Sequence, residues 1–476
     1  MQQPQAQPAE KFSEKFTDHA VNGVNPTEQT ADFVAAHRTE DVRQLALKAK
    51  RVEGLDLPLA LDQIAGWQIA CKKLPQWASC EGIVYPPHIS MEQCSSQFTA
   101  QYKSEIAQTL LTPAVTVRAR MSDSAESDNQ TTKSEPQLSN SPESDNCEVE
   151  MCLRMSDSPE SDTLVARSSM VDLTGGFGVD FSYLARGFSQ ATYVERQRHL
   201  CDLAEHNMAA LGLDQARIVC GDGVEYLRQM DPVDFIYLDP ARRDEHGSRT
   251  YAIEDCTPNV LELRDLLLAK SQCTLVKLSP MLDWRKAVAD FDGTVREVHI
   301  VATGNECKEL LLVLGQQVHE EPSAPRVFCV NDNQRIDYDS AAYTQGLRIG
   351  GKPLPEAKNY LYEPNASIMK AGCFDLVEER FGVTQVGPSS HLFVSATPVA
   401  DFPGRGFAIE EIGGMNKKDI KRLLNGTKQA NIAVRNFPLT APQLRKKLKL
   451  ADGGPVYLFG TTMQGCDHVL LRTSKI

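Results

Sequence analysis

The amino-acid sequence predicts an α/β fold whose central sheet is mostly parallel and ends in an antiparallel hairpin. From residue 168 onward, five strand-like segments alternate with helix-like segments, which is typical of a doubly wound parallel sheet. These strand-like segments are 169–173, 191–195, 216–222, 233–240 and 273–280. Two further strands, 294–302 and 308–315, are separated by only five residues. Because so short a connection has no room for a crossover helix, these two strands should pair antiparallel.

The regions on either side of this sheet predict smaller domains. Residues 25–117 carry apolar residues at helical spacing and predict an N-terminal helical domain, which follows a flexible tail over residues 1–24. The central α/β domain is expected over residues 168–317. Residues 318–404 predict a connecting segment, and residues 405–476 predict a small α+β domain of alternating strands and helices.

Residues 118–167 form an insert of different composition. The segment RMSDSAESD at 120–128 recurs as RMSDSPESD at 154–162, and the whole insert is rich in Ser, Asp and Glu. A segment with so few large apolar side chains cannot offset the entropy lost on ordering. We therefore predict a disordered, low-complexity insert that is not a functional site.

Composition excludes several classes of protein. The chain has no run of 18 apolar residues, and its N-terminal segment MQQPQAQPAEKF has no apolar core, so the sequence predicts neither a membrane-spanning helix nor a secretory signal. Its 13 cysteines include no CxxC pair, which disfavours both a disulfide framework and a zinc site. We expect a cytoplasmic protein with no membrane partner and no bound metal.

Charge is distributed unevenly along the chain. The net charge is −13, yet residues 405–476 contain thirteen Lys and Arg against five Asp and Glu, a local balance of +8. Residues 121–162 contain eleven acids against two basic residues, a balance of −9. The basic C-terminal region is either an ordinary solvated face or a surface for nucleic acid.

Four acidic residues lie where predicted strands of the central sheet end. They are Asp172, Glu195, Asp222 and Asp239. Ligands bind at the carboxyl ends of the strands in such sheets, so this set predicts a nucleotide-type cofactor pocket, with Glu195 placed for a ribose diol. The glycine-rich turn after Asp172 would let backbone amides approach that ligand closely. The alternative is that these acids are helix N-caps, a position that Asp also favours.

On these residues, the central domain resembles the class I S-adenosylmethionine (SAM)-dependent methyltransferases, which have a Rossmann-like sheet. The first motif of that family is an acid followed by glycines at alternating positions. Asp172, Gly176 and Gly178 match it, whereas Thr174 stands in place of the first glycine and Gly175 is additional. The G-x-G-x-x-G pattern of dinucleotide dehydrogenases is absent.

This resemblance implies a set of cofactor-binding residues. The residues that it implies for SAM are Asp172, Thr174, Gly175, Gly176, Gly178, Glu195 and Asp222. In the family, the acid of the first motif lies near the methionine moiety, and Glu195 and Asp222 correspond to the acids at the ribose and the adenine.

More narrowly, the chain is similar to bacterial methyltransferases that end in a THUMP-like domain. Segments that carry the likeness include MEQCSSQFTAQYK, VDLTGGFGVD, YLDPARR, NECKELL, YEPNASIMKAG and IAVRNFPLTAPQLRKKLKL. The likeness covers residues 25–117 and 168–476. It implies a ferredoxin-like segment before the THUMP-like domain and, because THUMP domains are associated with RNA-modifying enzymes, a structured RNA partner such as tRNA or rRNA.

The segment after the fourth strand indicates the type of methyl transfer. Asp239-Pro240 resembles the Asp/Asn-Pro-Pro-aromatic motif of amino methyltransferases, in which the acid and the next carbonyl accept hydrogen bonds from the target NH2. The aromatic residue is missing and Arg242 follows Ala241, so stacking on the base must come either from elsewhere or from the Arg guanidinium plane. Arg242 and Arg243 could instead bind a phosphate or form surface ion pairs. We expect Asp239, Pro240 and Arg242 to be catalytic.

The same segment also resembles the Asp-Pro-Pro-Arg of uridine C5-methyltransferases. Those enzymes need a cysteine nucleophile just after the fifth strand. Here that strand carries Lys277 near its end and Cys273 at its start. Nitrogen methylation by direct attack, in which catalysis is mostly positioning, therefore fits better than covalent carbon methylation.

Residues expected to bind the substrate are Arg243, Lys277, Lys421, Arg445 and Lys446. The last three belong to the basic C-terminal domain, where phosphate contacts would give salt-dependent affinity. Three hypotheses remain at this point: an RNA N-methyltransferase, a methyltransferase for a small molecule or protein, and a SAM-binding protein that binds RNA without turnover.

Overall fold

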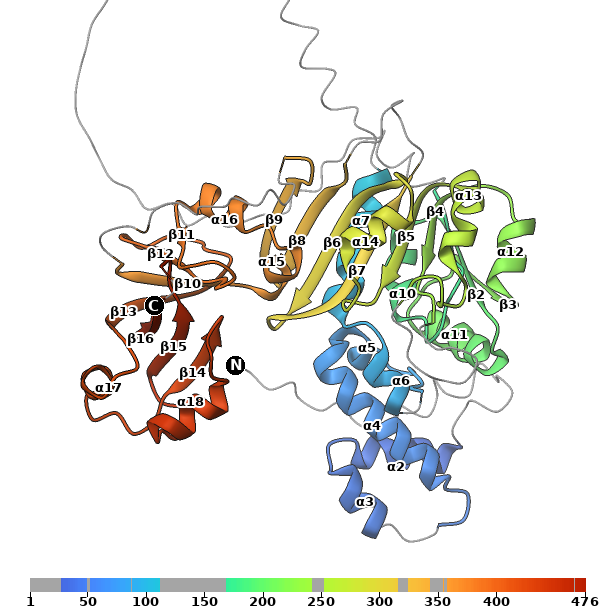
Figure 1. Cartoon of the computed structure of the whole chain (residues 1–476). Coiled ribbons are helices and arrows are strands. Elements are labelled where there is room, and N and C mark those ends of the chain that lie inside the picture. Colours follow the sequence, from blue (N-terminus) through green and yellow to red (C-terminus); the bar gives the residue numbers. More distant parts are fainter. Residues whose placement is uncertain are drawn as a thin grey trace, which may run out of the picture. The chain divides into compact units, whose positions relative to one another are not determined.

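The computed structural model describes most of the chain, in two compact units. The described residues are 27–48, 52–86, 88–111, 168–241, 252–315, 324–342, 354, 358–465 and 467–476. The first unit ends at residue 220 and the second begins at residue 221. Figure 1 labels the helices and strands named below. The predicted tail over 1–24 and the whole of the predicted insert over 118–167 lie outside the described residues, as do Arg242 and Arg243. In the part of the chain that the structure describes, no helix has the length and apolar composition needed to cross a membrane.

The N-terminal part of the first unit is helical. Its helices are α2 (Glu28–His37), α3 (Val42–Lys48), α4 (Leu57–Lys73), α5 (Pro75–Ser79), α6 (His88–Gln93) and α7 (Gln97–Leu111). Two segments with helical spacing, residues 30–49 and 91–111, are each divided rather than continuous. Asp41 accepts a hydrogen bond from the Gln44 amide, and Ser96 accepts one from the Thr99 amide. Each side chain caps the start of a new helix and so interrupts the pattern.

The first unit also contains three parallel strands. They are β1 (Ser169–Asp172), β2 (Gln190–Glu195) and β3 (Ala216–Cys220), with β2 paired to both others. The helices α10 (Val179–Leu184) and α11 (Arg198–Ala210) connect them, with a short 3-10 turn over Ala185–Gly187. The strand–helix alternation predicted for this region is confirmed.

The helical part packs directly against α10 and α11. The Asn207 side chain bonds both the amide and the carbonyl of Val84 at 2.9 Å, and the Trp77 indole donates to the Ser182 hydroxyl at 3.2 Å. Trp77 and Ser182 are both fully buried. The helical segment is therefore fixed to the helix that follows the glycine-rich turn.

The second unit continues the strand–helix alternation. Its elements are α12 (Gly223–Gln229), β4 (Val233–Leu238), α13 (Val260–Lys270), β5 (Ser271–Leu278), α14 (Trp284–Asp290), β6 (Val295–Thr303), β7 (Glu306–Leu314), β8 (Arg326–Asn331) and β9 (Gln334–Asp339). β4 and β5 are parallel, and β7 is antiparallel to both β5 and β6. The predicted terminal hairpin is confirmed.

Together, β1 to β9 form one mixed, mostly parallel sheet in the order β3-β2-β1-β4-β5-β7-β6-β8-β9. β8 pairs in parallel with β6, and β9 returns antiparallel to β8. The sheet therefore continues past residue 317, where the sequence predicts the central domain to end. Buried side chains on β8, such as Val327 and Cys329, extend its core.

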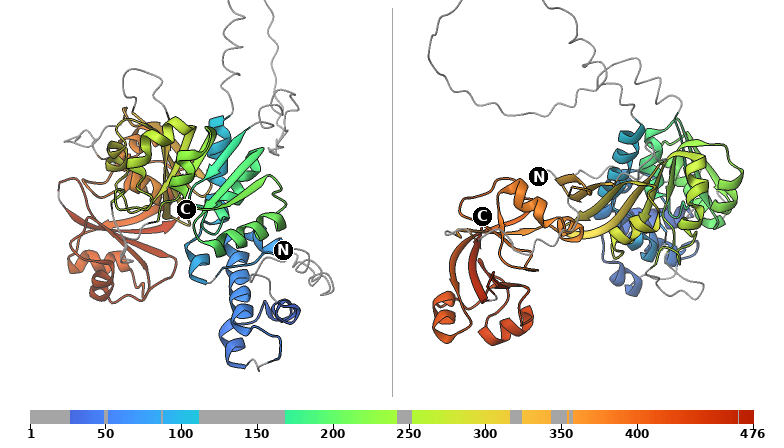
Figure 2. Two further views of the ribbon diagram at one scale, coloured as in Figure 1. Left: turned by 90° about the vertical axis from the view of Figure 1, so that its right-hand side faces the viewer. Right: turned by 45° about the horizontal axis from the view of Figure 1, so that its top comes forward.

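A second, seven-stranded sheet occupies the C-terminal part of the second unit (Figure 2). Its elements are β10 (Tyr360–Pro364), α15 (Ala366–Ala371), α16 (Phe374–Phe381), β11 (Thr384–Gln385), β12 (Phe393–Ser395), β13 (Gly404–Gly413), α17 (Lys417–Leu424), β14 (Asn431–Arg435), α18 (Ala441–Leu448), β15 (Val456–Thr462) and β16 (His468–Lys475). The strand order is β11-β12-β10-β13-β16-β15-β14. Buried Glu363 on β10 forms ion pairs with Arg405 on β13 and Arg435 on β14.

Candidate active site

The turn after β1 is held in place by its own carboxylates. Asp172 is buried, and its Oδ1 accepts a hydrogen bond from the Thr174 amide at 2.9 Å. The Gly176 amide donates to Glu195 Oε2 at 3.0 Å. Gly176 and Gly178 adopt positive φ angles of 56° and 81°, which glycine adopts without steric cost. The structure thus brings the predicted turn and the predicted ribose-binding acid together.

Gly175 has a steric reason to be glycine. A Cβ atom at this position would lie 2.2 Å from the ring of Tyr193 on β2. The Gly175 amide donates to the Val194 carbonyl at 2.9 Å, and the Tyr193 hydroxyl donates to the Gly176 carbonyl. The additional glycine therefore lets the turn lie directly on β2.

Glu195 is fixed by backbone groups at both carboxylate oxygens. Oε2 accepts from Gly176, and Oε1 accepts from the Gln197 amide at 2.9 Å. Each oxygen has a second lone pair, so the carboxylate keeps capacity to accept further hydrogen bonds, as a ribose diol would require. A carboxylate held in this way is pre-organised for a ligand.

A buried ion pair supports the helix that follows this turn. Lys103 on α7 is fully buried, and its Nζ lies 3.2 Å from Asp180 Oδ1 on α10. Ser95 donates to the other oxygen of Asp180 at 2.9 Å. Sequence analysis missed Asp180, although it stands two residues after Gly178; only the packing of α7 on α10 shows what it contacts.

In the second unit, Asp239 pairs with Lys277. Asp239 follows β4, Lys277 lies near the end of the neighbouring parallel strand β5, and Lys277 Nζ is 2.6 Å from Asp239 Oδ2. The Lys277 side chain is 14% exposed and that of Asp239 is 40% exposed, so the carboxylate is both anchored and accessible. Lys277 was predicted to bind substrate, and the structure gives it a contact with the predicted catalytic acid.

The residues after Asp239 are also held by backbone bonds. Pro240 is buried, and Ala241 exchanges two backbone hydrogen bonds with Thr257, at 2.8 and 2.9 Å. The next two predicted residues, Arg242 and Arg243, lie outside the described residues, so their roles stay predictions.

Asp222 is an N-cap in this structure. Its Oδ1 accepts hydrogen bonds from the amides of Val224 and Glu225, at 2.9 and 3.1 Å, and so starts α12. For this acid, the alternative interpretation as a helix cap therefore describes the contacts that the structure shows. Its predicted adenine contact stays a prediction.

Cys273 has the properties of an inert core residue. It lies near the start of β5 and is 8% exposed, and burial raises the pKa of its thiol to about 12. A thiol with so high a pKa is almost entirely protonated at neutral pH and is a poor nucleophile. This agrees with the argument against covalent carbon methylation.

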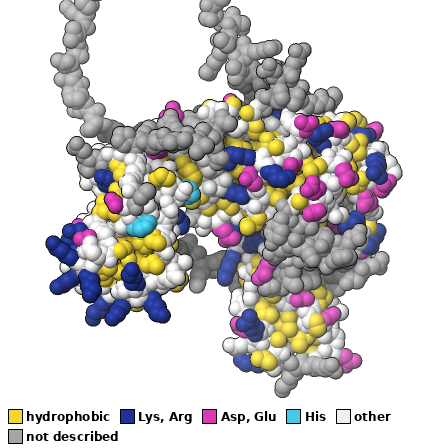
Figure 3. Space-filling model, viewed as in Figure 1, with side chains coloured by type: hydrophobic (Ala, Val, Ile, Leu, Met, Phe, Trp, Pro, Cys, Tyr) yellow, Lys and Arg dark blue, Asp and Glu magenta, His cyan; other side chains and the backbone are white. Residues whose placement is uncertain are grey.

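Basic side chains gather over α17 and α18, as Figure 3 shows. The exposed members of this basic face are Lys417, Lys418, Lys421, Arg422, Lys446, Lys447 and Lys449. Within the described residues, none of these lysines forms an ion pair, whereas Arg422 pairs with Glu411. Arg445 also pairs, with Asp452 at 2.6 Å. Of the three predicted substrate contacts here, Lys421 and Lys446 are therefore more available than Arg445.

The mixed sheet, with this strand order and its terminal antiparallel strands, is the fold of class I methyltransferases. Within the C-terminal part, residues 360–403 match a ferredoxin-like domain and residues 404–475 match a THUMP domain-like family. Within the described ranges, no group of His, Cys, Asp and Glu side chains could hold a metal ion.

The chain is a homologue of a protein from Porphyromonas gingivalis W83 whose crystal structure is named as that of a putative methyltransferase. The two are 29% identical, the match covers 94% of this chain and 97% of that chain, and the TM-score is 0.72. Solved structures with smaller overlaps include an SAM-dependent methyltransferase from Agrobacterium tumefaciens (18% identity, 32% of this chain, 56% of that chain, TM-score 0.25) and an O-methyltransferase from Bacillus cereus in complex with SAH (9% identity, 58% of this chain, 96% of that chain, TM-score 0.30). Comparison with curated proteins gives no match.

Proposed function

We propose that this protein is an SAM-dependent methyltransferase that methylates a nitrogen of a base in structured RNA, such as tRNA or rRNA. The observation that carries the proposal is the Asp239–Lys277 pair. It presents an anchored, accessible carboxylate just beyond β4, the position of the catalytic acid in amino methyltransferases. The homologue whose structure is named as that of a putative methyltransferase matches over nearly the full length of both chains and supports the reaction class.

The first unit contains groups that fit the cofactor. SAM, when bound, supplies an electrophilic methyl group. Buried Asp172, the positive-φ glycines Gly176 and Gly178, and the fixed carboxylate of Glu195 would hold it, with Thr174 and Gly175 shaping the turn. The steric demand at Gly175 supports this assignment, because a side chain there would push the turn away from β2.

Asp239 would orient the substrate. Its carboxylate is 40% exposed, and its two oxygens together have about four lone pairs, so it has the capacity to accept a hydrogen bond from a target amino group while Lys277 holds Oδ2. Such a bond aligns the nitrogen for attack, and alignment is the main contribution expected of the protein in this chemistry. Lys277 holds the acid in position and so acts as a positioning residue.

The basic face supports an RNA substrate over a small molecule or a protein. Its exposed lysines would contact phosphates without reading base edges, which gives sequence-independent and salt-dependent affinity. The THUMP domain-like match over the same residues points the same way. The free cysteines among the described residues fit a reducing compartment, and we propose the cytoplasm.

The test is incubation of the purified protein with isotope-labelled SAM and fractionated cellular RNA, followed by nucleoside mass spectrometry. We expect label in one N-methylated nucleoside and none with the Asp239→Ala variant. Label in a C5-methylated pyrimidine, or label with small molecules or proteins but not RNA, would contradict the proposal.

A further inference from the structure

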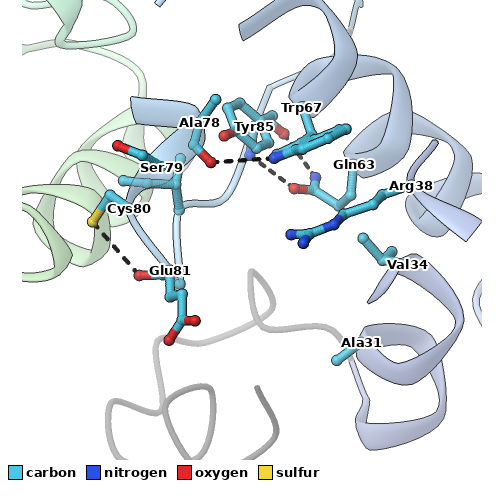
Figure 4. Close-up of a pocket in the computed structure, with 12 residues that line it drawn as sticks. Ala31, Val34, Arg38, Gln63, Trp67, Ala78, Ser79, Cys80, Glu81 and Tyr85 are labelled. Carbon is cyan, nitrogen blue, oxygen red and sulfur yellow. Dashed lines mark hydrogen bonds between the residues drawn. The ribbon is translucent and has the colours of Figure 1, made fainter. Parts of the chain in front are cut away.

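The N-terminal helical segment contains a cavity of about 220 Å³ (Figure 4). Its lining comes from α2, α4 and residues 78–85, all within the first unit, and includes Val34, Trp67, Ile83 and Tyr85. Pockets for drug-sized ligands are typically about 300–1,000 Å³. This cavity is therefore of a size for one ring system, and the methyl-transfer residues described above do not line it.

Most polar groups of the cavity wall already have partners. The Gln63 side chain bonds both the amide and the carbonyl of Tyr85 at 2.8 Å, and the Trp67 indole donates to the Ala78 carbonyl at 3.2 Å. Tyr85 donates its hydroxyl to Trp77. The wall therefore offers mainly apolar and aromatic surface, with few groups free to read the edge of a base.

The charged residues of the lining are Arg38 and Glu81, and Figure 4 shows the Glu81 carboxylate directed away from Arg38. The guanidinium carbon of Arg38 lies 4.9 Å from the centroid of the Trp67 ring, and Figure 4 shows it pointing into the space between the labelled residues. No described residue forms an ion pair with its guanidinium. A guanidinium that stacks on an indole keeps its N–H edge free, and this edge matches the geometry of a phosphate or carboxylate.

The cavity thus combines a flat aromatic wall with a guanidinium, that of Arg38, which no described residue pairs with. We infer that it binds a nucleotide unit, with the base against the apolar wall beside Trp67 and the phosphate on Arg38. The inference rests on the proposed RNA substrate and deepens it, because it makes the N-terminal helical segment a second RNA-binding region besides the basic face. Since the wall has few free polar groups, the site has little base preference.

Trp67 provides a direct readout in the full-length protein. The chain has three tryptophans, and the other two, Trp77 and Trp284, are buried at 0% and 5% exposure. The probes are adenosine 5′-monophosphate, adenosine, a short 5′-phosphorylated oligoribonucleotide and benzoate. We expect saturable quenching by the monophosphate and the oligonucleotide, which Trp67→Phe abolishes, and binding of adenosine that is at least about tenfold weaker.

Substitution of Arg38 tests the phosphate contact. Arg38→Met should weaken binding of the monophosphate at least about tenfold. Arg38→Lys keeps the charge but loses the planar fork, so its affinity should lie between those of the wild-type protein and the methionine variant. Arg43→Met is the matched control, because Arg43 is exposed on α3 and does not line the cavity. It should leave quenching unchanged. An unaltered thermal unfolding midpoint shows that a variant is folded. If Arg38→Met does not fold, the affinity of Arg38→Lys for the monophosphate tests the phosphate contact instead.

The two nucleotide probes distinguish the source of the ligand. Equal affinities for the monophosphate and the oligonucleotide indicate a free or terminal nucleotide, whereas binding of the oligonucleotide alone indicates a nucleotide within a strand. Absence of saturable quenching, quenching that Arg38→Met does not change, or binding of benzoate without either nucleotide would overturn the inference. A parallel titration with SAM distinguishes failure of this inference from failure of the proposed function. SAM binding without quenching by nucleotides rejects the site beside Trp67 alone, whereas quenching without SAM binding rejects the proposed methyltransferase instead.

Discussion

The turn after β1, where the cofactor is proposed to bind, and the basic face differ in how their charged side chains are held. In the turn, the carboxylates of Asp172 and Glu195 are fixed by backbone amides at 2.9–3.0 Å. On α17 and α18, the lysines are exposed, and none of them forms an ion pair within the described residues. Fixed charges suit one ligand in one orientation, whereas mobile exposed charges suit a polyanion whose phosphates vary in position. A single substitution in the turn should therefore lower ligand affinity strongly. A single substitution on the basic face should lower RNA affinity only slightly, and several such substitutions should add up.

The largest effect is expected at Asp239. Asp239→Ala removes the acceptor that would align the target nitrogen and should lower the methylation rate by about 100- to 1,000-fold. SAM affinity, measured by calorimetry, should stay within about threefold, which is well under 1.4 kcal/mol. Asp234→Ala is the matched control, because Asp234 lies at the opposite end of the same strand, where it accepts a hydrogen bond from Gln272 at 2.7 Å. Turnover that survives Asp239→Ala would refute its role.

Glu195→Gln should weaken binding of the cofactor rather than slow methyl transfer directly. The carboxylate accepts backbone hydrogen bonds at both oxygens, and an amide can accept at only one, so the turn or the ribose must lose a partner. We expect SAM affinity to fall by about tenfold or more. Glu205→Gln, an exposed change on α11, is the control. Equal SAM affinities for both variants would show that Glu195 does not bind the cofactor.

A smaller effect is expected from the pair Gly175→Ala and Gly221→Ala. The first places a Cβ 2.2 Å from the Tyr193 ring and should lower the free energy of unfolding by about 1–3 kcal/mol. The second has no atom within 4 Å of the added Cβ and should change stability little. Urea unfolding of the two variants measures the difference. Equal midpoints would mean that the turn is not packed on β2 as described.

The smallest effects per residue are expected on the basic face. Lys421→Gln and Lys446→Gln should each weaken RNA binding a few-fold and lower the slope of log affinity against log salt by about 1. Lys286→Gln is the control, since Lys286 is exposed but paired with Asp290 at 2.7 Å. Binding that depends on one of these lysines by several orders of magnitude would contradict a diffuse phosphate contact.

The alternation of strands and helices could be predicted from the sequence because each segment has its own periodicity. The place of β8 and β9 could not, because the pattern of 326–339 indicates a strand pair without saying which sheet it joins. Parallel pairing of β8 with β6 decides that, and this pairing is a long-range contact. The same holds for β10, which joins the ferredoxin-like match to the THUMP-like match through β13.

The candidate site divides in the same way. Strand-end acids can be recognised from the sequence, since the end of a strand is a local property. The Asp239–Lys277 pair joins residues 38 positions apart, and the Lys103–Asp180 pair joins two helices that the insert separates in the sequence. The cavity beside Trp67 carries no motif at all, because it depends on how α2, α4 and residues 78–85 pack.

The most direct test of the central claim is calorimetric titration of the folded, full-length protein with SAM and with its demethylated product. A pocket built around Asp172, Gly176 and Glu195 predicts saturable binding of both ligands, at one site per chain, that Glu195→Gln weakens and Arg43→Met does not. A folded protein that binds neither ligand would contradict the account.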